Sequence, residues 1–430
     1  MKYLPIVKEL FIHNRKNLAK RLKPKSVAIF NSSDIMPTSA DGTMPFIQDA
    51  NLFYLSGIDQ EESILLLAPN FPDERFREIL FLKETNEEIA IWEGHKYTVS
   101  EAQETSGVKT IMWLDKFEST LATIMAESDE VYLDTNEHIR NASRVETRSD
   151  RFIKLCKEHF PLHEYNRIVP HLYDLRCIKS QLEIDQIQQA CDITESGFRR
   201  ILDKTHPGVW EYELEAEYSH EFLRKRSRGF AYDPIIASGA NACVLHYVEN
   251  NQQCKDGDLL LMDVGAEYAN YNADMTRTIP VNGKFSKRQR AVYDAVLRVK
   301  NAATAMLVPG NVIPDYHKAV GEVMEKELVD LDLISISDIK NQKAEWPAYK
   351  KYFMHGTSHH LGLNVHDVAS IYKKFEPGMV FTVEPGIYIR EEGIGIRLED
   401  NIVITENGHI NLMKNIPIEA DEIESLMNKG

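Results

Sequence analysis

Two segments of this sequence each place a pair of carboxylates inside strand-like runs that are otherwise mostly apolar. The first, LLLMDVGAEYANYNADMTRTIPV, holds Asp263 and Asp274. The second, MVFTVEPGIYIREEGIGIRLEDNIVIT, holds Glu384 and Glu399. Each segment has the pattern of a β-hairpin, with two strands around a polar turn. Like charges repel in such surroundings, so the fold must supply something that neutralises these four acids.

The turn positions predict how the carboxylates face each other. With each turn centred on its polar residues, Asp263 falls directly opposite Asp274, and Glu384 falls directly opposite Glu399. Cross-strand neighbours lie roughly 5 Å apart. Each pair is therefore expected to be close enough to share an ion.

The cost of burying these charges indicates a cationic partner. Any one of the acids alone could be an ordinary ion-paired or solvent-facing group. Four uncompensated buried ions, at several kcal/mol each, would exceed a folding stability of about 5–15 kcal/mol. Arg277 and Arg397 can offset part of the charge, but two divalent metals compensate four carboxylates better and leave the arginines to orient the ligands.

A histidine ligand is expected to complete the site, and the stretch MHGTSHHLGLNVHDV is the candidate source. It contains His355, His359, His360 and His366. The spacing of the first two resembles H-x-x-x-H, but Gly356 stands where a zincin needs its glutamate, which excludes that class. A single histidine is more often a hydrogen-bonded core residue, yet four within this stretch favour a site.

Other classes of chemistry lack their motifs. The sequence has no G-x-S-x-G elbow, no cysteine beside a base motif and no phosphate-binding fingerprint. Its five cysteines are scattered without C-x-x-C spacing, so we expect buried, inert thiols. The net charge of −16 disfavours nucleic-acid binding. No segment approaches the roughly 20 apolar residues of a membrane span, and the charge-interleaved N-terminal helix indicates a cytoplasmic protein.

The length of 430 residues predicts two domains. The first, residues 1–172, is expected to be a small α/β domain, because the strand-like runs VAIF, NLFYL, ESILLLA, EILFL, TIMWL and EVYL alternate with polar turns and a helix near residues 116–125. The second, residues 173–430, is expected to begin with a long helix capped by Ser180 and Glu183. Further helices are predicted over residues 210–226, 287–307 and 315–328.

Several motifs, in their order along the chain, resemble the pita-bread metallopeptidases. They are ASGANACVLHY, LLLMDVGAEYANYNADMTRT, MHGTSHHLGLNVHD, GMVFTVEPGIYI and GIRLEDNIVIT, over roughly residues 176–415. The match is to the proline-specific branch, which contains Xaa-Pro aminopeptidases and Xaa-Pro dipeptidases. The resemblance implies an α/β N-terminal domain of the creatinase type followed by an α+β pita-bread catalytic domain.

Carried over by position, the resemblance implies five metal ligands. Asp263 would bind one ion, His359 and Glu384 the other, and Asp274 and Glu399 would bridge the two. Glu384 would also be the proton shuttle. Oxygen-rich ligation favours Mn²⁺ over Zn²⁺, with Co²⁺ or Fe²⁺ able to substitute.

The resemblance also implies roles for residues around the metals. His246 and His366 would contact the substrate and stabilise the reacting carbonyl. The residues His355, Tyr388 and Arg397 would recognise proline and order the site, and Tyr232 would lie behind the ligands. His360 would form a pocket wall rather than a further ligand.

The expected activity is release of the residue that precedes proline from a peptide substrate. A dipeptidase would share every catalytic residue, so it stays open as the alternative; we favour the aminopeptidase because MHGTSHHLGLNVHD and the short loop after it resemble that subfamily more closely. A non-catalytic peptide-binding relative is disfavoured by the retained ligands. We expect a homodimer or homotetramer in which Trp92 lines a neighbour's site.

Overall fold

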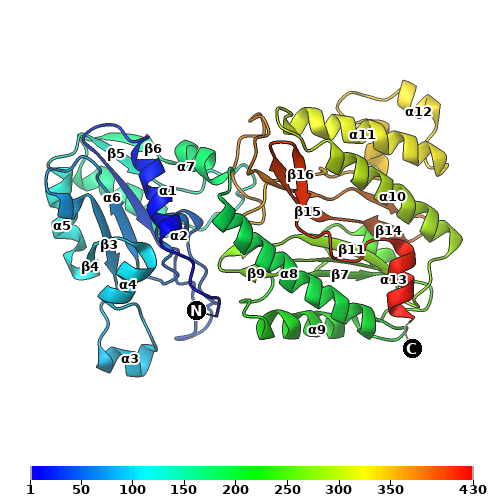
Figure 1. Cartoon of the computed structure of the whole chain (residues 1–430), viewed down its shortest axis with the longest axis horizontal. Helices are drawn as coiled ribbons and strands as arrows, with labels where there is room; N and C mark the ends of the chain where they lie inside the picture. The colour runs from blue at the N-terminus through cyan, green and yellow to red at the C-terminus, as the bar shows by residue number, and fades with distance from the viewer. Residues whose placement is uncertain (1, 429–430) are drawn as a thin grey trace. The chain divides into compact units, whose positions relative to one another are not determined.

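A computed structural model describes residues 2–428 of the chain. The described chain divides into two compact units, Tyr3–Arg176 and a second that begins at Cys177. The boundary predicted near residue 172 falls inside the last helix of the first unit, α7 (Val169–Arg176). Figure 1 labels many of the elements of both units.

The first unit is built on a six-stranded mixed sheet with the strand order β4-β3-β2-β1-β5-β6. Its strands are β1 (Ser26–Asn31), β2 (Ile64–Leu67), β3 (Glu78–Leu82), β4 (Thr110–Trp113), β5 (Glu130–Leu133) and β6 (Glu164–Arg167). Its other helices are α1 (Glu9–Ala19), α2 (Ala50–Ser56), α3 (Glu87–Glu93), α4 (Val99–Ser106), α5 (Phe117–Met125) and α6 (Arg148–His159). Every residue of β1 and β2 is buried, as in a sheet covered on both faces. The predicted α/β architecture is confirmed.

One predicted strand of this unit is wrong, because the run NLFYL forms helix α2. Asp49 begins the helix by accepting hydrogen bonds from the backbone N–H groups of Asn51 and Leu52, each at 2.9 Å. Gly57 ends it with a left-handed φ of 68°. The apolar residues between are buried on all sides, and periodicity cannot separate such a short helix from a buried strand.

The second unit surrounds several small sheets with long helices, as Figure 1 shows for α8 to α11. Its helices are α8 (Gln181–Lys204), α9 (Glu211–Arg224), α10 (Lys287–Ala305), α11 (Ile313–Asp330), α12 (Ile336–Lys340) and α13 (Ala420–Met427). Its strands are β7 (Ile235–Ser238), β8 (Leu259–Val264), β9 (Glu267–Tyr268), β10 (Tyr271–Asn272), β11 (Met275–Pro280), β12 (Val380–Val383), β13 (Gly386–Ile389), β14 (Ile394–Arg397), β15 (Asp400–Thr405) and β16 (Gly408–Asn411). All four helices predicted for this unit are therefore present.

The first carboxylate hairpin has a different register from the predicted one. Its turn consists of Ala269 and Asn270, whose φ angles of 52° and 66° are both positive, as a two-residue type I′ turn requires. Asp263 consequently faces Thr276 in the β8–β11 ladder and not Asp274. The shift of two positions keeps both aspartates on the predicted face, because side chains alternate with a period of two.

The second carboxylate hairpin has the predicted register. Gly386 pairs with Arg397 in the β13–β14 ladder, and Val383 pairs with Asp400 in the β12–β15 ladder. Glu384 and Glu399 lie in the gap between these two ladders, whose common register places them opposite each other. This hairpin joins the first one where the Glu399 backbone N–H donates to the Thr276 carbonyl at 3.0 Å.

Two further predictions concern helix capping and cysteines. The Glu183 carboxylate accepts the Ser180 backbone N–H at 2.8 Å, which is one half of the predicted capping box. All five cysteines are free and buried, as predicted.

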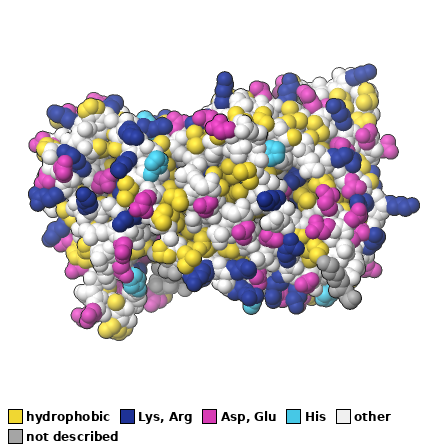
Figure 2. Space-filling view, in the orientation of Figure 1, with side chains coloured by type: hydrophobic (Ala, Val, Ile, Leu, Met, Phe, Trp, Pro, Cys, Tyr) yellow, Lys and Arg dark blue, Asp and Glu magenta, His cyan; other side chains and the backbone are white. Residues whose placement is uncertain are grey.

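None of the helices within residues 2–428 combines the length and apolar character needed to cross a membrane. Acidic and basic side chains are interspersed on the face drawn in Figure 2.

Candidate metal centre

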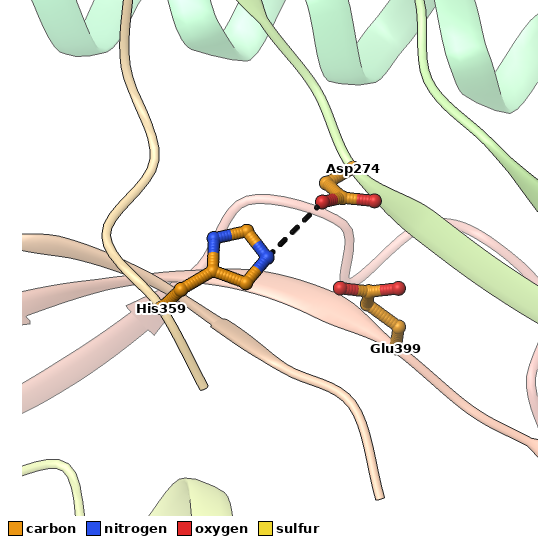
Figure 3. Close-up of side chains that lie close together, drawn as sticks. All are labelled: Asp274, His359 and Glu399. Carbon is orange, nitrogen blue, oxygen red and sulfur yellow. Dashed lines mark ion pairs between the residues drawn. The ribbon is translucent and has the colours of Figure 1, made fainter. Parts of the chain in front are cut away.

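Three predicted ligands converge in the second unit. Atoms of Asp274, His359 and Glu399 lie within 4.8 Å of one another. Asp274 precedes β11, His359 lies in the loop before β12, and Glu399 lies between β14 and β15. Figure 3 shows the three side chains pointing toward one another from these separate segments. The fold therefore brings together a carboxylate from each hairpin and an imidazole.

The His359 ring is held in an orientation suited to ligation. Its Nδ1 lies 3.0 Å from the carbonyl oxygen of His360. A proton on Nδ1 leaves the Nε2 lone pair facing the carboxylates, 3.4 Å from Asp274 Oδ2 and 3.7 Å from Glu384 Oε1. A hydrogen bond from the second ring nitrogen to a backbone carbonyl is the usual support of a metal-binding histidine.

Tyr232 links the two aspartates of the first hairpin. Its hydroxyl oxygen lies 2.6 Å from Asp263 Oδ1 and 2.6 Å from Asp274 Oδ1. A tyrosine hydroxyl has one proton, so it can donate to only one of them at a time. The close approach of the two carboxylates to one hydroxyl therefore favours a further cation or proton at this point.

Arg397 connects the Asp263 carboxylate to residues that are predicted to bind substrate. Its Nη2 donates to Asp263 Oδ2 at 2.7 Å, and its Nη1 donates to Tyr388 Oη at 2.7 Å. Tyr388 Oη in turn lies 2.8 Å from His355 Nε2. Burial and the positive charge of Arg397 lower the pKa of His355 to about 3, so this imidazole is neutral at physiological pH.

Arg277 pairs its charge with Asp400 and supports the backbone of a predicted ligand. Its Nη2 donates to Asp400 Oδ1 at 2.7 Å, and Lys300 also pairs with Asp400. The remaining donors reach backbone oxygens, including that of Glu399 at 2.6 Å. Arg277 therefore holds the backbone beside a ligand, while its charge is matched by Asp400.

The electrostatics show an excess of buried negative charge. Burial raises the pKa of Glu384 to about 7, and it also raises the pKa values of Glu399 and Asp263. Glu399 Oε1 is buried and has no hydrogen-bond partner among residues 2–428. Buried polar groups are rarely left unpaired. Carboxylate oxygens and one imidazole around an unsatisfied oxygen are a donor set that fits divalent metal ions.

The other predicted histidines lie around this cluster or against it. The His366 ring packs edge-on against the His359 ring, with centroids 4.4 Å apart. His246 lies in an exposed turn. His360 is buried against Phe381, with ring centroids 4.2 Å apart, and it is not among the grouped ligand atoms.

Trp92 lies in the first unit, on helix α3, where its side chain is 87% exposed. No residue of this helix is buried. Its proposed role in a neighbouring subunit stays a prediction.

Thr276 is a site residue that the sequence patterns above do not predict. Its hydroxyl donates to Glu399 Oε2 at 2.7 Å and accepts from Arg397 Nε at 3.0 Å. A hairpin centred on the turn at Ala269 and Asn270 would have placed Thr276 opposite Asp263, so the missing information was the turn type.

The fold and this cluster define a metallopeptidase. The profile described as metallopeptidase family M24 matches residues 185–406, and that described as the aminopeptidase P N-terminal domain matches residues 11–132. The first therefore covers the cluster and most of the unit that surrounds it. The chain belongs to the aminopeptidase P family.

Similar proteins match along almost the whole chain. The Xaa-Pro aminopeptidase of Haemophilus influenzae is 36% identical, with 98% of this chain and 97% of that protein covered. The Escherichia coli Xaa-Pro aminopeptidase is 34% identical, with 98% of each covered. The structure of proline aminopeptidase P II from Yersinia pestis superposes with a TM-score of 0.89 at 34% identity, covering 99% of this chain and 100% of that one.

Proposed function

We propose that this protein is an Xaa-Pro aminopeptidase, which hydrolyses the bond between the first residue of a peptide and a proline in the second position. The observation that supports it most directly is the cluster of Asp274, His359 and Glu399 around an unsatisfied buried oxygen of Glu399. Family membership and the full-length similarity to Xaa-Pro aminopeptidases support the choice of reaction.

The proposed cofactor is a pair of divalent ions, with Mn²⁺ ranked above Zn²⁺ because oxygen ligands predominate. Asp263 would hold one ion, His359 and Glu384 the other, and Asp274 and Glu399 both. When bound, such ions supply a water of lowered pKa as nucleophile and polarise the scissile carbonyl.

The surrounding residues would manage protons and charge. Glu384 would accept a proton from the nucleophilic water at a carboxylate oxygen and pass it on. His366 and His246 would donate hydrogen bonds to the oxygen on which negative charge develops. The neutral His355, fixed by Tyr388, would offer an uncharged ring to the apolar proline.

The proline nitrogen in the scissile bond carries no hydrogen and cannot donate a hydrogen bond. Recognition of the proline must therefore depend on its shape. His355, Tyr388 and Arg397 form one hydrogen-bonded chain that can give such a pocket a fixed wall. The named relatives are aminopeptidases, and no observation here favours a dipeptidase.

A paired substrate panel with metal quantification tests the proposal. The metal-free protein is reconstituted with Mn²⁺ and given Xaa-Pro-Yaa-Zaa, Xaa-Ala-Yaa-Zaa and the dipeptide Xaa-Pro. We expect release of Xaa from the first peptide, with a kcat/KM at least about tenfold above that for the other two. Equal cleavage of the alanine peptide, or preference for the dipeptide, would reject the proposed specificity.

We also propose that the protein is a cytoplasmic oligomer. Its substrates would be peptides, and it would have no membrane or nucleic-acid partner. Support for an interface on the first unit is the exposure of two large apolar side chains of α3, Ile91 at 79% and Trp92 at 87%. Light scattering on the parent protein tests the oligomer, and we expect a dimer or tetramer. Peptide hydrolysis by the parent and by Trp92→Ala tests the role of Trp92, and we expect a lower KM for the parent than for the variant.

A further inference from the structure

The side chain of Asn401 is bonded to both backbone groups of a predicted ligand. Asn401 lies in β15 and is fully buried. Its Oδ1 accepts the backbone N–H of Asp274 at 3.1 Å, and its Nδ2 donates to the backbone oxygen of Asp274 at 2.6 Å. The Cys191 thiol donates to the same Oδ1 at 3.4 Å. Every one of these groups is removed from solvent.

This contact replaces strand pairing at a break in the first hairpin. Asp274 falls after the end of β10 at Asn272 and before the start of β11 at Met275. The Asn401 amide presents one donor and one acceptor, as a neighbouring strand would. The orientation of the Asp274 backbone, and hence of its carboxylate, is therefore fixed by a side chain from the second hairpin.

The segment that leads into β15 carries another predicted ligand. Glu399 lies two positions before Asn401, directly before β15 begins at Asp400. The Glu399 backbone N–H also donates to the Thr276 carbonyl at 3.0 Å. Asn401 thus ties the backbone of one bridging carboxylate to the segment that carries the other.

We propose that Asn401 is a positioning residue for the metal centre, which holds Asp274 at the distance from Glu399 that two shared ions require. The inference rests on the metal-binding part of the proposed function. A buried amide that served packing alone would affect the stability of the metal-free protein but would leave metal affinity unchanged.

The test compares metal affinity and metal-free stability in two full-length variants. Asn401→Leu keeps the side-chain size and removes both hydrogen bonds to the Asp274 backbone, while Asn401→Ser is a smaller polar variant that also cannot reach both backbone groups. Asn250→Leu is the matched control, because the Asn250 amide likewise accepts from the backbone of Ile236 and donates to that of Pro234, each at 2.9 Å. Mn²⁺ dissociation constants are measured by calorimetry without substrate, and stability by urea unfolding of the metal-free proteins.

We expect the Asn401 variants to bind Mn²⁺ about 10- to 100-fold more weakly than the parent, and Asn250→Leu to stay within about threefold of it. Unchanged affinity in either folded Asn401 variant, or an equal loss in the control, would overturn the proposal. The affinity measurement uses no substrate. A parent protein that binds Mn²⁺ but does not cleave proline peptides would therefore contradict the proposed reaction and not the role of Asn401.

Discussion

The Thr276 hydroxyl donates a 2.7 Å hydrogen bond to Glu399 Oε2, which joins the two carboxylate hairpins through their side chains. Thr276 faces Asp263 in the β8–β11 ladder, and its oxygen accepts from Arg397 Nε at 3.0 Å. One hydroxyl therefore connects a predicted bridging ligand with the arginine that holds Asp263.

Replacing Thr276 by valine keeps the shape of the side chain and removes this connection. The loss leaves Glu399 Oε2 and Arg397 Nε without a buried partner, which costs about 1–3 kcal/mol. We expect Mn²⁺ affinity to fall about 10- to 100-fold, as for other residues that support metal ligands. Calorimetric titration of the metal-free protein measures it.

Thr278→Val provides the control for this variant. Thr278 is a buried threonine on the same strand, but its hydroxyl donates to the backbone oxygen of Arg397 at 3.1 Å and not to a carboxylate. It should lower stability without changing the Mn²⁺ dissociation constant beyond about threefold. Equal metal affinities of the two variants would show that the Thr276–Glu399 bond does not support the centre.

Glu384 should make the stability of the metal-free protein depend on pH. Burial raises its folded-state pKa from the ordinary 4.5 to about 7, so the folded state binds the proton more tightly than the unfolded state. Stability is then full below about pH 4.5 and is lost as the pH rises to about 7, by about 2–3 kcal/mol.

The variant Glu384→Gln removes this titration. Urea unfolding of the metal-free parent and variant between these two pH values should show a smaller fall in the variant. Parallel curves would mean that Glu384 is not the group responsible.

Lys179 and Asp367 form a buried ion pair beside the predicted catalytic histidine His366. Lys179 Nζ lies 2.8 Å from Asp367 Oδ2, and each side chain is 1% exposed. Lys179→Met should cost about 3–5 kcal/mol, because a buried carboxylate loses its cation. The double variant Lys179→Met with Asp367→Asn should regain much of that stability in urea unfolding. Additive losses would show that the pair does not interact as described.

The sequence predicted the ligand segments well because each hairpin combines a polar turn with apolar strands. The register of the second hairpin was predicted correctly. In the first hairpin, the turn is centred on Ala269 and Asn270, whose φ angles are both positive. Asp263 therefore pairs with Thr276 and not with Asp274. Neither residue is a glycine, so the turn type was not visible from composition.

The support around the ligands was less predictable. Arg397 and Tyr232 were identified through family resemblance, but Thr276 and Asn401 contact ligands more than 120 residues away along the chain. The apolar segment NLFYL suits a buried strand as well as a short helix, and the cap by Asp49 is what distinguishes them. Contacts between distant segments depend on three-dimensional packing, which periodicity along the chain does not report.

We propose that the buried carboxylate cluster binds the metal that hydrolysis requires. The most direct measurement is the metal content of the purified protein, reconstituted with Mn²⁺, for the parent and for Asp274→Asn, together with cleavage of Xaa-Pro-Yaa-Zaa. We predict two ions per chain in the parent, loss of activity on chelation with recovery on adding Mn²⁺, and reduced occupancy in the variant. Full activity of a metal-free parent, or two ions per chain retained in Asp274→Asn, would contradict the account.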